Sequence, residues 1–414
     1  MTQGSVAELE KELEALSEIR VFNDHVQSGV DRILALMPRP DEERNPEEKV
    51  RLLTLRSRAR LLLPVFSAEA ERDCSAALKL CGDRADLWVL LSECLLRRNA
   101  SREACSALDN ALQADERNVK ALCQYSQVLR SMSSDASLTP AERKQYIADS
   151  VIRAKTAVAA CPTNADGWHS YGISLLSEAL ASGTNISGAC KSLQAFQRAA
   201  SLVPSDPDIR CNKSTVEGLL GNFGNAAVDL IAALEADSVR LKGTEKQLEL
   251  FVTTLRHVQS RMECLKQSGG KPLRTLMAKL SKRTVGTTVK DVLEGKAPTP
   301  CTVVLGVLDV LGESSMEPLV TLAMDRNKEF VLLLFYGLRR GALKINNSIV
   351  TISAPPSVVT QVEHHVPAVP LLDTKELSMS CIQVYADTNS TLVNDAPISP
   401  HMQVQPRMSS RLFV

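Results

Sequence analysis

The sequence predicts a mainly α-helical protein: a solenoid of stacked helix pairs, followed by a small C-terminal β-barrel. Three observations predict it. Trp88 and Trp168 each open an apolar helical segment, and each segment leads to a second one with small residues at regular spacing. From Cys301 onward the apolar period changes from that of helices to that of strands. The 414 residues are too many for one core, and their 4% aromatic content suits an Ala- and Leu-rich solenoid.

The helical part repeats one pattern. A small, a large and a small residue follow each tryptophan at spacings of four and three: Ala104, Leu108, Ala111 and Ser192, Phe196, Ala199. The tryptophans are 80 residues apart, which is 12 more than two repeats of 34. We place the extra residues in a loop at Met132–Arg143, and a second insertion at Ser177–Gly188. The pattern resembles the tetratricopeptide repeat, whose period is about 34 residues. A generic helical bundle is the alternative, and the recurrence of the pattern in phase disfavours it.

Stacked helix pairs of this kind leave a concave groove lined by their first helices. We count Trp88, Leu122, Trp168 and Arg210 as the fourth position of a first helix. The groove positions are then Asp86, Val89, Glu93, Leu96, Arg97, Lys120, Cys123, Gln127, Arg130, Ser131, Asp166, His169, Ile173, Leu176, Ser177, Asp208, Cys211, Thr215, Gly218 and Leu219.

Other segments flank the repeats. We predict a helix over Val6–Met37 that is broken near Asn23, a helix over Glu47–Leu63, and a capping helix over Thr244–Cys264. The predicted domains are an N-terminal helix and linker (1–46), the solenoid (47–265), a basic linker (266–298), the barrel (299–390) and a disordered tail (391–414).

The segment between solenoid and barrel is basic and contains no acid from residue 266 to residue 290. Its cations are Lys266, Lys271, Arg274, Lys279, Lys282, Arg283 and Lys290. One interpretation is a contact to phosphate, with RNA as the ligand. A solvated linker with a short helix is the equal alternative.

Five strand-like runs follow, separated by turn residues. They are Thr302–Leu311, Leu319–Met324, Phe330–Tyr336, Ser348–Ile352 and Ser380–Tyr385. Five short strands in about 90 residues suit an OB-fold, the oligonucleotide- and oligosaccharide-binding barrel. These strands carry few aromatic or basic residues. A barrel that binds protein, or that is only structural, is therefore at least as plausible as one that binds nucleic acid.

Composition excludes several classes. Lys+Arg and Asp+Glu are both 48, so a globally basic nucleic-acid binder is not expected. The 11 cysteines show no paired spacing, which predicts reduced thiols and neither disulfides nor zinc. The acidic N-terminal segment is unlike a signal peptide, and no apolar run is long enough to span a bilayer. These features predict a cytoplasmic protein, and a nuclear location is the alternative.

No catalytic constellation is evident. The six histidines form no metal-binding motif, and the sequence has no phosphate-binding glycine loop and no nucleophile elbow. We therefore predict no enzyme activity and no cofactor. A chaperone-binding carboxylate clamp is also disfavoured, because Val89, Glu93, Cys123 and Gln127 occupy positions where the clamp needs Lys and Asn.

Several short stretches resemble one family of tetratricopeptide repeat proteins, the nascent-tubulin readers of tubulin autoregulation. In the solenoid they are Val128-Leu129-Arg130, Asp149-Ser150-Val151, Ala154-Lys155 and Pro207-Asp208-Ile209. In the barrel they are Val304-Leu305-Gly306, Gly341-Ala342-Leu343 and Asn347-Ser348-Ile349-Val350. The likeness covers most of residues 50 to 390.

The resemblance implies a ribosome-associated adaptor that recognises the tubulin N-terminus, Met-Arg-Glu, near the exit tunnel. Such proteins trigger tubulin mRNA decay through an adaptor and a deadenylase. Family members are also described as nuclear stress-responsive transcriptional coactivators, which is the alternative function.

The resemblance also implies site residues. Arg130 and Asp208 match the family's peptide contacts, with Gln127, His169 and Ile173 beside them, and we expect Val89, Ile173 and Leu176 to offer apolar surface to the peptide's Met. A third family contact is acidic but falls near Lys242, so Glu245 is the expected substitute. Lys79 matches a ribosome-contacting Lys, whereas the neighbouring family Lys corresponds to Ala76.

Overall fold

The computed structural model describes residues 3–19, 23–40, 43, 45–181, 183, 185–237, 241, 243–267, 271–283, 286–298, 301–311, 318–354, 362–365, 378–385, 391–399, 401 and 403. The chain divides into two compact units, each with its own hydrophobic core. Unit 1 is Met1–Glu178 with Ser201–Val203, and unit 2 is Ala179–Ala200 with Pro204–Val414.

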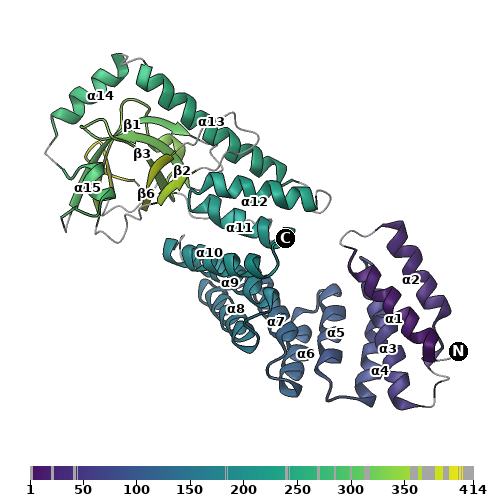
Figure 1. The fold of residues 1–414 in the computed structure, drawn as a ribbon. Helices are drawn as coiled ribbons and strands as arrows, with labels where there is room; N and C mark the ends of the chain where they lie inside the picture. Colours follow the sequence, from purple (N-terminus) through teal and green to yellow (C-terminus); the bar gives the residue numbers. More distant parts are fainter. Residues whose placement is uncertain are drawn as a thin grey trace. The chain divides into compact units, whose positions relative to one another are not determined.

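Helices dominate the chain up to residue 293 (Figure 1). They are α1 (Gln3–Ser17), α2 (Asp24–Leu36), α3 (Pro46–Leu61), α4 (Ala68–Leu80), α5 (Ala85–Arg97), α6 (Ser101–Ala114), α7 (Val119–Met132), α8 (Pro140–Ala160), α9 (Ala165–Ala181), α10 (Ile186–Leu202), α11 (Pro207–Leu219), α12 (Phe223–Ala236), α13 (Glu245–Gln267), α14 (Lys271–Ser281) and α15 (Val289–Leu293). The predicted helices at the N-terminus, before the repeats and after them are confirmed. The break at Asn23 is also confirmed, because its side chain caps α2.

The counted phase of the repeats is confirmed by a recurring hydrogen bond. Trp88 Nε1 donates to the Gly82 carbonyl at 2.8 Å, and Trp168 Nε1 donates to the Pro162 carbonyl at 2.8 Å. Arg210 Nε makes the equivalent bond to the Pro204 carbonyl at 2.7 Å. In α5, α9 and α11, the fourth residue of the helix thus donates a hydrogen bond to the turn before that helix. The donor is an indole in α5 and α9 and a guanidinium in α11.

The small residues of the pattern lie where helices pack closely. Ala104, Leu108 and Ala111 of α6 are fully buried, as are Phe196 and Ala199 of α10. One detail of the sequence interpretation is wrong: Met132–Arg143 is not all loop. Thr139 and Glu142 form a capping box that starts α8 at Pro140, so part of the insertion lengthens that helix.

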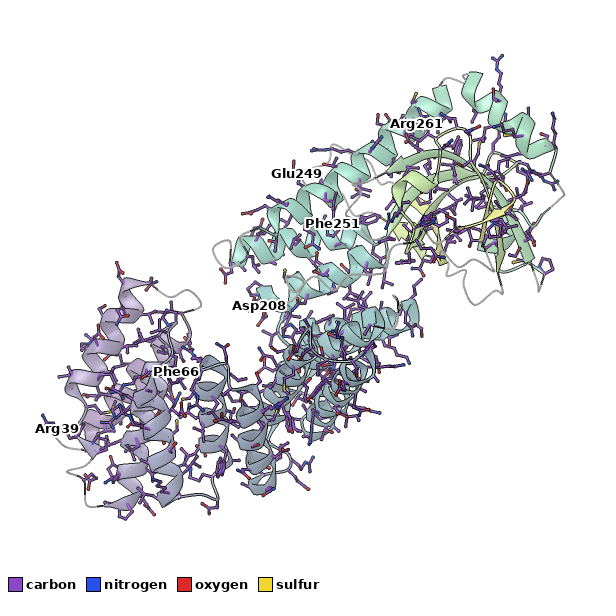
Figure 2. All side chains as sticks on the ribbon, turned by 180° about the vertical axis from the view of Figure 1, so that it is seen from behind. Arg39, Phe66, Asp208, Glu249, Phe251 and Arg261 are labelled. Carbon is purple, nitrogen blue, oxygen red and sulfur yellow. The ribbon has the colours of Figure 1, made fainter. Side chains whose placement is uncertain are left out.

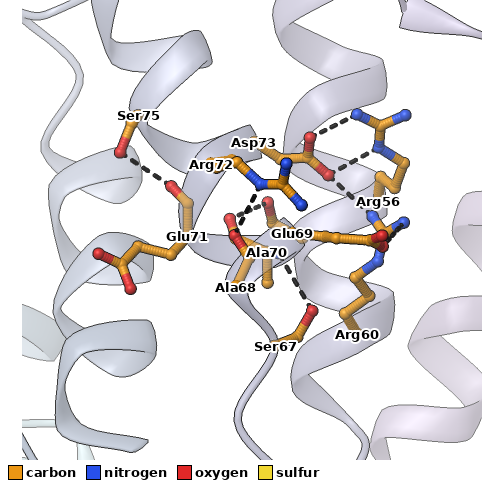
Figure 3. Close-up of polar contacts among 11 residues, drawn as sticks. Arg56, Arg60, Ser67, Ala68, Glu69, Ala70, Glu71, Arg72, Asp73 and Ser75 are labelled. Atoms are coloured by element: carbon orange, nitrogen blue, oxygen red, sulfur yellow. Dashed lines mark hydrogen bonds and ion pairs between the residues drawn. The ribbon is translucent and has the colours of Figure 1, made fainter. Parts of the chain in front are cut away.

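Helices α3 and α4 are joined by charge as well as by apolar packing (Figure 3). The Asp73 carboxylate is 5% exposed and accepts hydrogen bonds from Arg56 Nε at 2.6 Å and from Arg60 Nη1 at 2.8 Å. Arg60 also pairs with Glu69 at 2.6 Å. Two guanidinium groups therefore compensate for the desolvation of one buried carboxylate.

The strands of unit 2 form one sheet with the order β5-β6-β3-β2-β1-β4-β7-β8. They are β1 (Cys301–Leu311), β2 (Leu319–Met324), β3 (Phe330–Tyr336), β4 (Ile349–Ala354), β5 (Val362–His365), β6 (Ser378–Tyr385), β7 (Thr391–Val393) and β8 (Ala396–Pro397). Neighbours are antiparallel except β3 and β6, which are parallel. All five predicted strands are confirmed, and closure into an OB-fold barrel stays a prediction.

The disordered tail predicted from residue 391 is wrong for the residues that the structure describes there. Strand β7 pairs with β4, and Ile398 is 1% exposed in the core. Asn394 and Asp395 have φ of 52° and 68°, which the tight turn between β7 and β8 requires. Two strands this short carry no readable period, so the polar composition misled the interpretation.

Both faces of the central strands are buried. Residues such as Leu305, Leu333 and Phe335 face the core of the sheet. On the opposite face, helices of the same unit cover the strands: Leu276 of α14 packs on Gly306, and the Tyr336 hydroxyl donates to the Leu219 carbonyl at 2.8 Å. OB-folds commonly bind oligonucleotides through the outer face of their second and third strands. Here helices lie against that face at β1 and β3, and every residue of β2 is buried.

The capping helix α13 links the last repeat to the sheet. Its Phe251 packs on Phe223 of α12 with ring centroids 5.9 Å apart, and its Arg261 pairs with Asp309 of β1 at 3.2 Å (Figure 2). In the part of the chain that the structure describes, no helix is long and apolar enough to cross a membrane.

Candidate functional site

Unit 1 contains a cavity of about 980 Å³ on the side formed by α1, α3, α5 and α7. Four of the predicted groove residues line it: Asp86, Val89, Glu93 and Lys120. Its walls carry ion pairs, such as Lys120 with Glu93 at 2.8 Å. These are four of the twenty counted groove positions, and Arg130, Gln127, His169 and Ile173 are not among the residues that line the cavity.

Arg130 lies at the opposite end of α7, ten residues beyond Lys120, or about 15 Å along the helix. Its Nη1 donates to the hydroxyl oxygens of Ser126 and Ser174, both at 2.7 Å. Burial lowers the pKa of the guanidinium to about 10. Of the carboxylates that the structure describes, none forms an ion pair with it.

This arrangement is unusual for a buried arginine. Desolvation of a guanidinium is costly unless an anion or several hydrogen bonds compensate for it. Here two neutral hydroxyl groups supply hydrogen bonds but no negative charge. Since part of the residue remains accessible to solvent, an external carboxylate can supply that charge.

The other predicted contacts of the Arg130 region differ in exposure. Gln127 is exposed and His169 is partly buried, so both can meet a ligand. Ile173 is 7% exposed and Leu176 only 1%. The expectation that Val89, Ile173 and Leu176 offer apolar surface to a peptide is wrong for Leu176, whose side chain is packed into the interior. Val89 is also only 2% exposed, although it lines the cavity.

Asp208 lies in unit 2, in the first turn of α11 (Figure 2). The helix cap is its neighbour Asp206, whose Oδ1 accepts from the backbone N–H groups of Asp208 and Ile209 at 2.8 and 3.1 Å. Asp208 is therefore not the cap, but a carboxylate in the first turn of a helix is favoured by the helix dipole, so this structural role remains beside the predicted peptide contact. Glu245 is exposed at the start of α13, where it accepts from the Gly243 N–H, and Lys242 lies outside the described residues.

The predicted RNA-contacting residues fall into three groups. Lys79, Arg274, Lys282 and Lys290 are exposed. Lys279 contacts Asn347 and Arg283 pairs with Asp395, so these two also serve the packing of α14 and its C-terminal end on the sheet. The side chains of Lys266 and Lys271 lie outside the described residues.

Helix α11 also carries a buried carboxylate. Glu217 is 3% exposed, and its pKa is raised to about 8 by burial, with the charge of Asp229 adding to the effect. Lys213 lies between the two acids, at 3.4 Å from Glu217 and 2.6 Å from Asp229, and Arg210 pairs with Asp229 at 3.1 Å.

We expect Glu217→Gln to raise the free energy of unfolding at about pH 8.5 by about 1 to 3 kcal/mol. The folded state keeps the Glu217 proton up to a pKa of about 8, whereas the ordinary value is 4.5. Folding therefore takes up a proton between these values, so stability falls as the pH rises through that window and is restored below it. Urea unfolding at about pH 5 and pH 8.5 measures the difference. Exposed Glu235→Gln is the control, and a pH dependence that survives in Glu217→Gln would contradict the assignment.

Metal chemistry finds no support in the described part of the chain, where no group of three or more His, Cys, Asp or Glu is placed to hold an ion. All the cysteines lie within it and none forms a disulfide, although Cys74 and Cys94 have their sulfur atoms 3.9 Å apart. The serine pair under Arg130 is the feature that sequence reasoning missed. Its only signal was that Ser126 follows the apolar Leu122 by four residues and so shares the buried face of α7.

Comparisons with known proteins agree with the repeat architecture. No family model matches the chain. It is 28% identical over 212 residues to human tetratricopeptide repeat protein 5, covering 50% of this chain and 47% of that protein. The mouse protein of the same name is 27% identical over 222 residues, covering 53% and 48%. The chain thus spans about half the length of the curated relatives it matches.

Solved structures give a weaker likeness. A thermophilic TPR protein of Thermus thermophilus has a TM-score of 0.38 at 17% identity, covering 50% of this chain and 96% of that one. Pseudomonas aeruginosa pilF has a TM-score of 0.40 at 14% identity, covering 52% and 86%. The sequence matches confirm the resemblance drawn from the motifs: this chain is similar to tetratricopeptide repeat protein 5.

Proposed function

We propose that this chain is a peptide-binding adaptor that recognises the nascent N-terminus of tubulin, Met-Arg-Glu, at the ribosome exit. It then triggers co-translational decay of the tubulin mRNA in the cytoplasm, through an mRNA-decay adaptor and a deadenylase complex. Its tetratricopeptide-type solenoid and its similarity to tetratricopeptide repeat protein 5 support a protein-binding adaptor in general.

The observation that carries the proposal is Arg130. It is a cation desolvated by burial, held by two hydroxyls and lacking a described carboxylate partner. A ligand with a carboxylate compensates for that charge, and the Glu of Met-Arg-Glu supplies one. The assignment of the peptide's Arg to Asp208 stays a prediction from charge complementarity.

Ribosome association is assigned to Lys79 and the exposed cations of α14 and the residue after it. Each phosphate contact adds roughly 0.7 to 0.9 to the log–log salt slope of binding. We expect the triple variant Lys79→Glu, Arg274→Glu, Lys282→Glu to lose cosedimentation with translating ribosomes while binding free peptide normally. All three side chains are exposed, so the fold should tolerate the change.

The matched control carries the same charge change elsewhere: Lys144→Glu, Lys155→Glu, Lys191→Glu, all at exposed positions. Sequencing of the mRNA in the wild-type pellet shows whether tubulin messages are enriched. If both triple variants pellet like the wild type, or if tubulin messages are not enriched, the ribosomal proposal is wrong.

A further inference from the structure

We infer that Ser126 and Ser174 are positioning residues for Arg130: they hold one edge of its guanidinium so that the other edge faces a ligand carboxylate. The identity of the ligand rests on the proposed function. The positioning itself rests on the geometry of three helices in unit 1.

The two hydroxyls form a connected pair. Their oxygens are 2.8 Å apart, and each lies 2.7 Å from Arg130 Nη1. Ser126 Oγ also lies 2.9 Å from the Ser150 carbonyl, and Ser174 Oγ lies 3.0 Å from the Ser170 carbonyl. Each hydroxyl has one proton and two lone pairs. The two protons are shared among the two carbonyls and the contact between the hydroxyls, and in every such arrangement both oxygens keep a lone pair for Nη1.

This arrangement restricts the guanidinium to one orientation. Nη1 has two N–H groups, and each serves one serine. The hydrogen bonds recorded for this side chain all leave from Nη1, so the edge formed by Nε and Nη2 is the one that remains for a ligand. That edge carries two parallel N–H donors, the geometry that binds a carboxylate through both oxygens.

Serine hydroxyls are neutral, so they hold the Arg130 guanidinium without compensating its positive charge. Ser126 and Ser174 are both fully buried, so bulk solvent does not reach their hydroxyls. An aspartate in place of either would also accept from Arg130, but it would neutralise the guanidinium and could not donate to the backbone carbonyl that the serine hydroxyl contacts. A neutral acceptor pair fixes the cation and leaves its charge for the ligand.

The test compares full-length variants Ser126→Ala, Ser174→Ala and the double variant with Ser92→Ala. Ser92 is a matched control, because it is also fully buried and its hydroxyl donates to a backbone carbonyl at 2.7 Å. The readouts are the Kd for a peptide beginning Met-Arg-Glu, the Kd for its Met-Arg-Gln analogue, and stability in urea. We expect the double variant to bind the Glu peptide about 5- to 30-fold more weakly and to lose most of its preference for Glu over Gln.

A purely structural role would lower stability in all four variants and leave the Glu-over-Gln preference unchanged, which would overturn the inference. Ser174→Asp gives an independent arm. It supplies an internal carboxylate, so the folded protein should lose the Glu peptide, and normal binding by this variant would also overturn the inference. If Arg130→Ala itself binds normally, the proposed function fails first; if only the serine variants bind normally, the positioning alone is wrong.

Discussion

Replacing Arg130 by alanine is expected to weaken the binding of a Met-Arg-Glu peptide about tenfold to a hundredfold, with the solenoid still folded. A charge-assisted hydrogen bond contributes about 1.5 to 3 kcal/mol, and the variant leaves the peptide's carboxylate without its partner. Folding should survive, because the wild type already bears the cost of a desolvated cation that no described carboxylate compensates.

The contact itself is tested by a double-mutant cycle. The wild type and Arg130→Ala are each titrated with the Glu peptide and with its Gln analogue by isothermal calorimetry. Arg130→Glu should in turn recover part of the binding to a peptide whose Glu is changed to Lys. Arg102→Ala is the control, since Arg102 is an exposed cation of α6, outside the predicted groove positions and the cavity. A coupling energy near zero would show that Arg130 does not meet the peptide's carboxylate.

Replacing Gly221 by valine is expected to destabilise unit 2 by about 2 to 5 kcal/mol. Gly221 has a φ of +85°, and a Cβ added there would lie 2.3 Å from Leu334 Cδ1 on β3. The variant combines backbone strain of about 1 to 2 kcal/mol with overpacking of about 1 to 3 kcal/mol. The effect should appear as a lower midpoint in urea for the unfolding of the sheet.

A glycine with similar backbone strain separates these two causes. Gly243 has a φ of +100°, but no atom of the described residues lies within 4 Å of an added Cβ. Gly243→Val should therefore show the strain alone. If the two variants lose the same free energy of unfolding, the turn between α11 and α12 does not pack tightly against the sheet.

Local pattern was sufficient for much of the fold. The spacing of Trp88 and Trp168 set the repeat phase, which the matching hydrogen bonds of both residues and of Arg210 confirm. The five main strands were also predictable, because runs of strand-forming residues separated by turn residues are a local signal in the sequence. Strands β7 and β8 are too short to show an alternation of apolar and polar residues, and there the prediction was wrong.

The candidate site divides in the same way. Sequence alone placed Arg130 at a predicted groove position of a first helix and marked the basic residues of the segment before the sheet. Only the tertiary structure brought Ser126 of α7 and Ser174 of α9 to the same nitrogen atom, and only it placed α11 of unit 2 against the outer face of β3. Periodicity reports which residues of one element share a face. It contains no information on what another element, 44 or 117 residues away, places against that face.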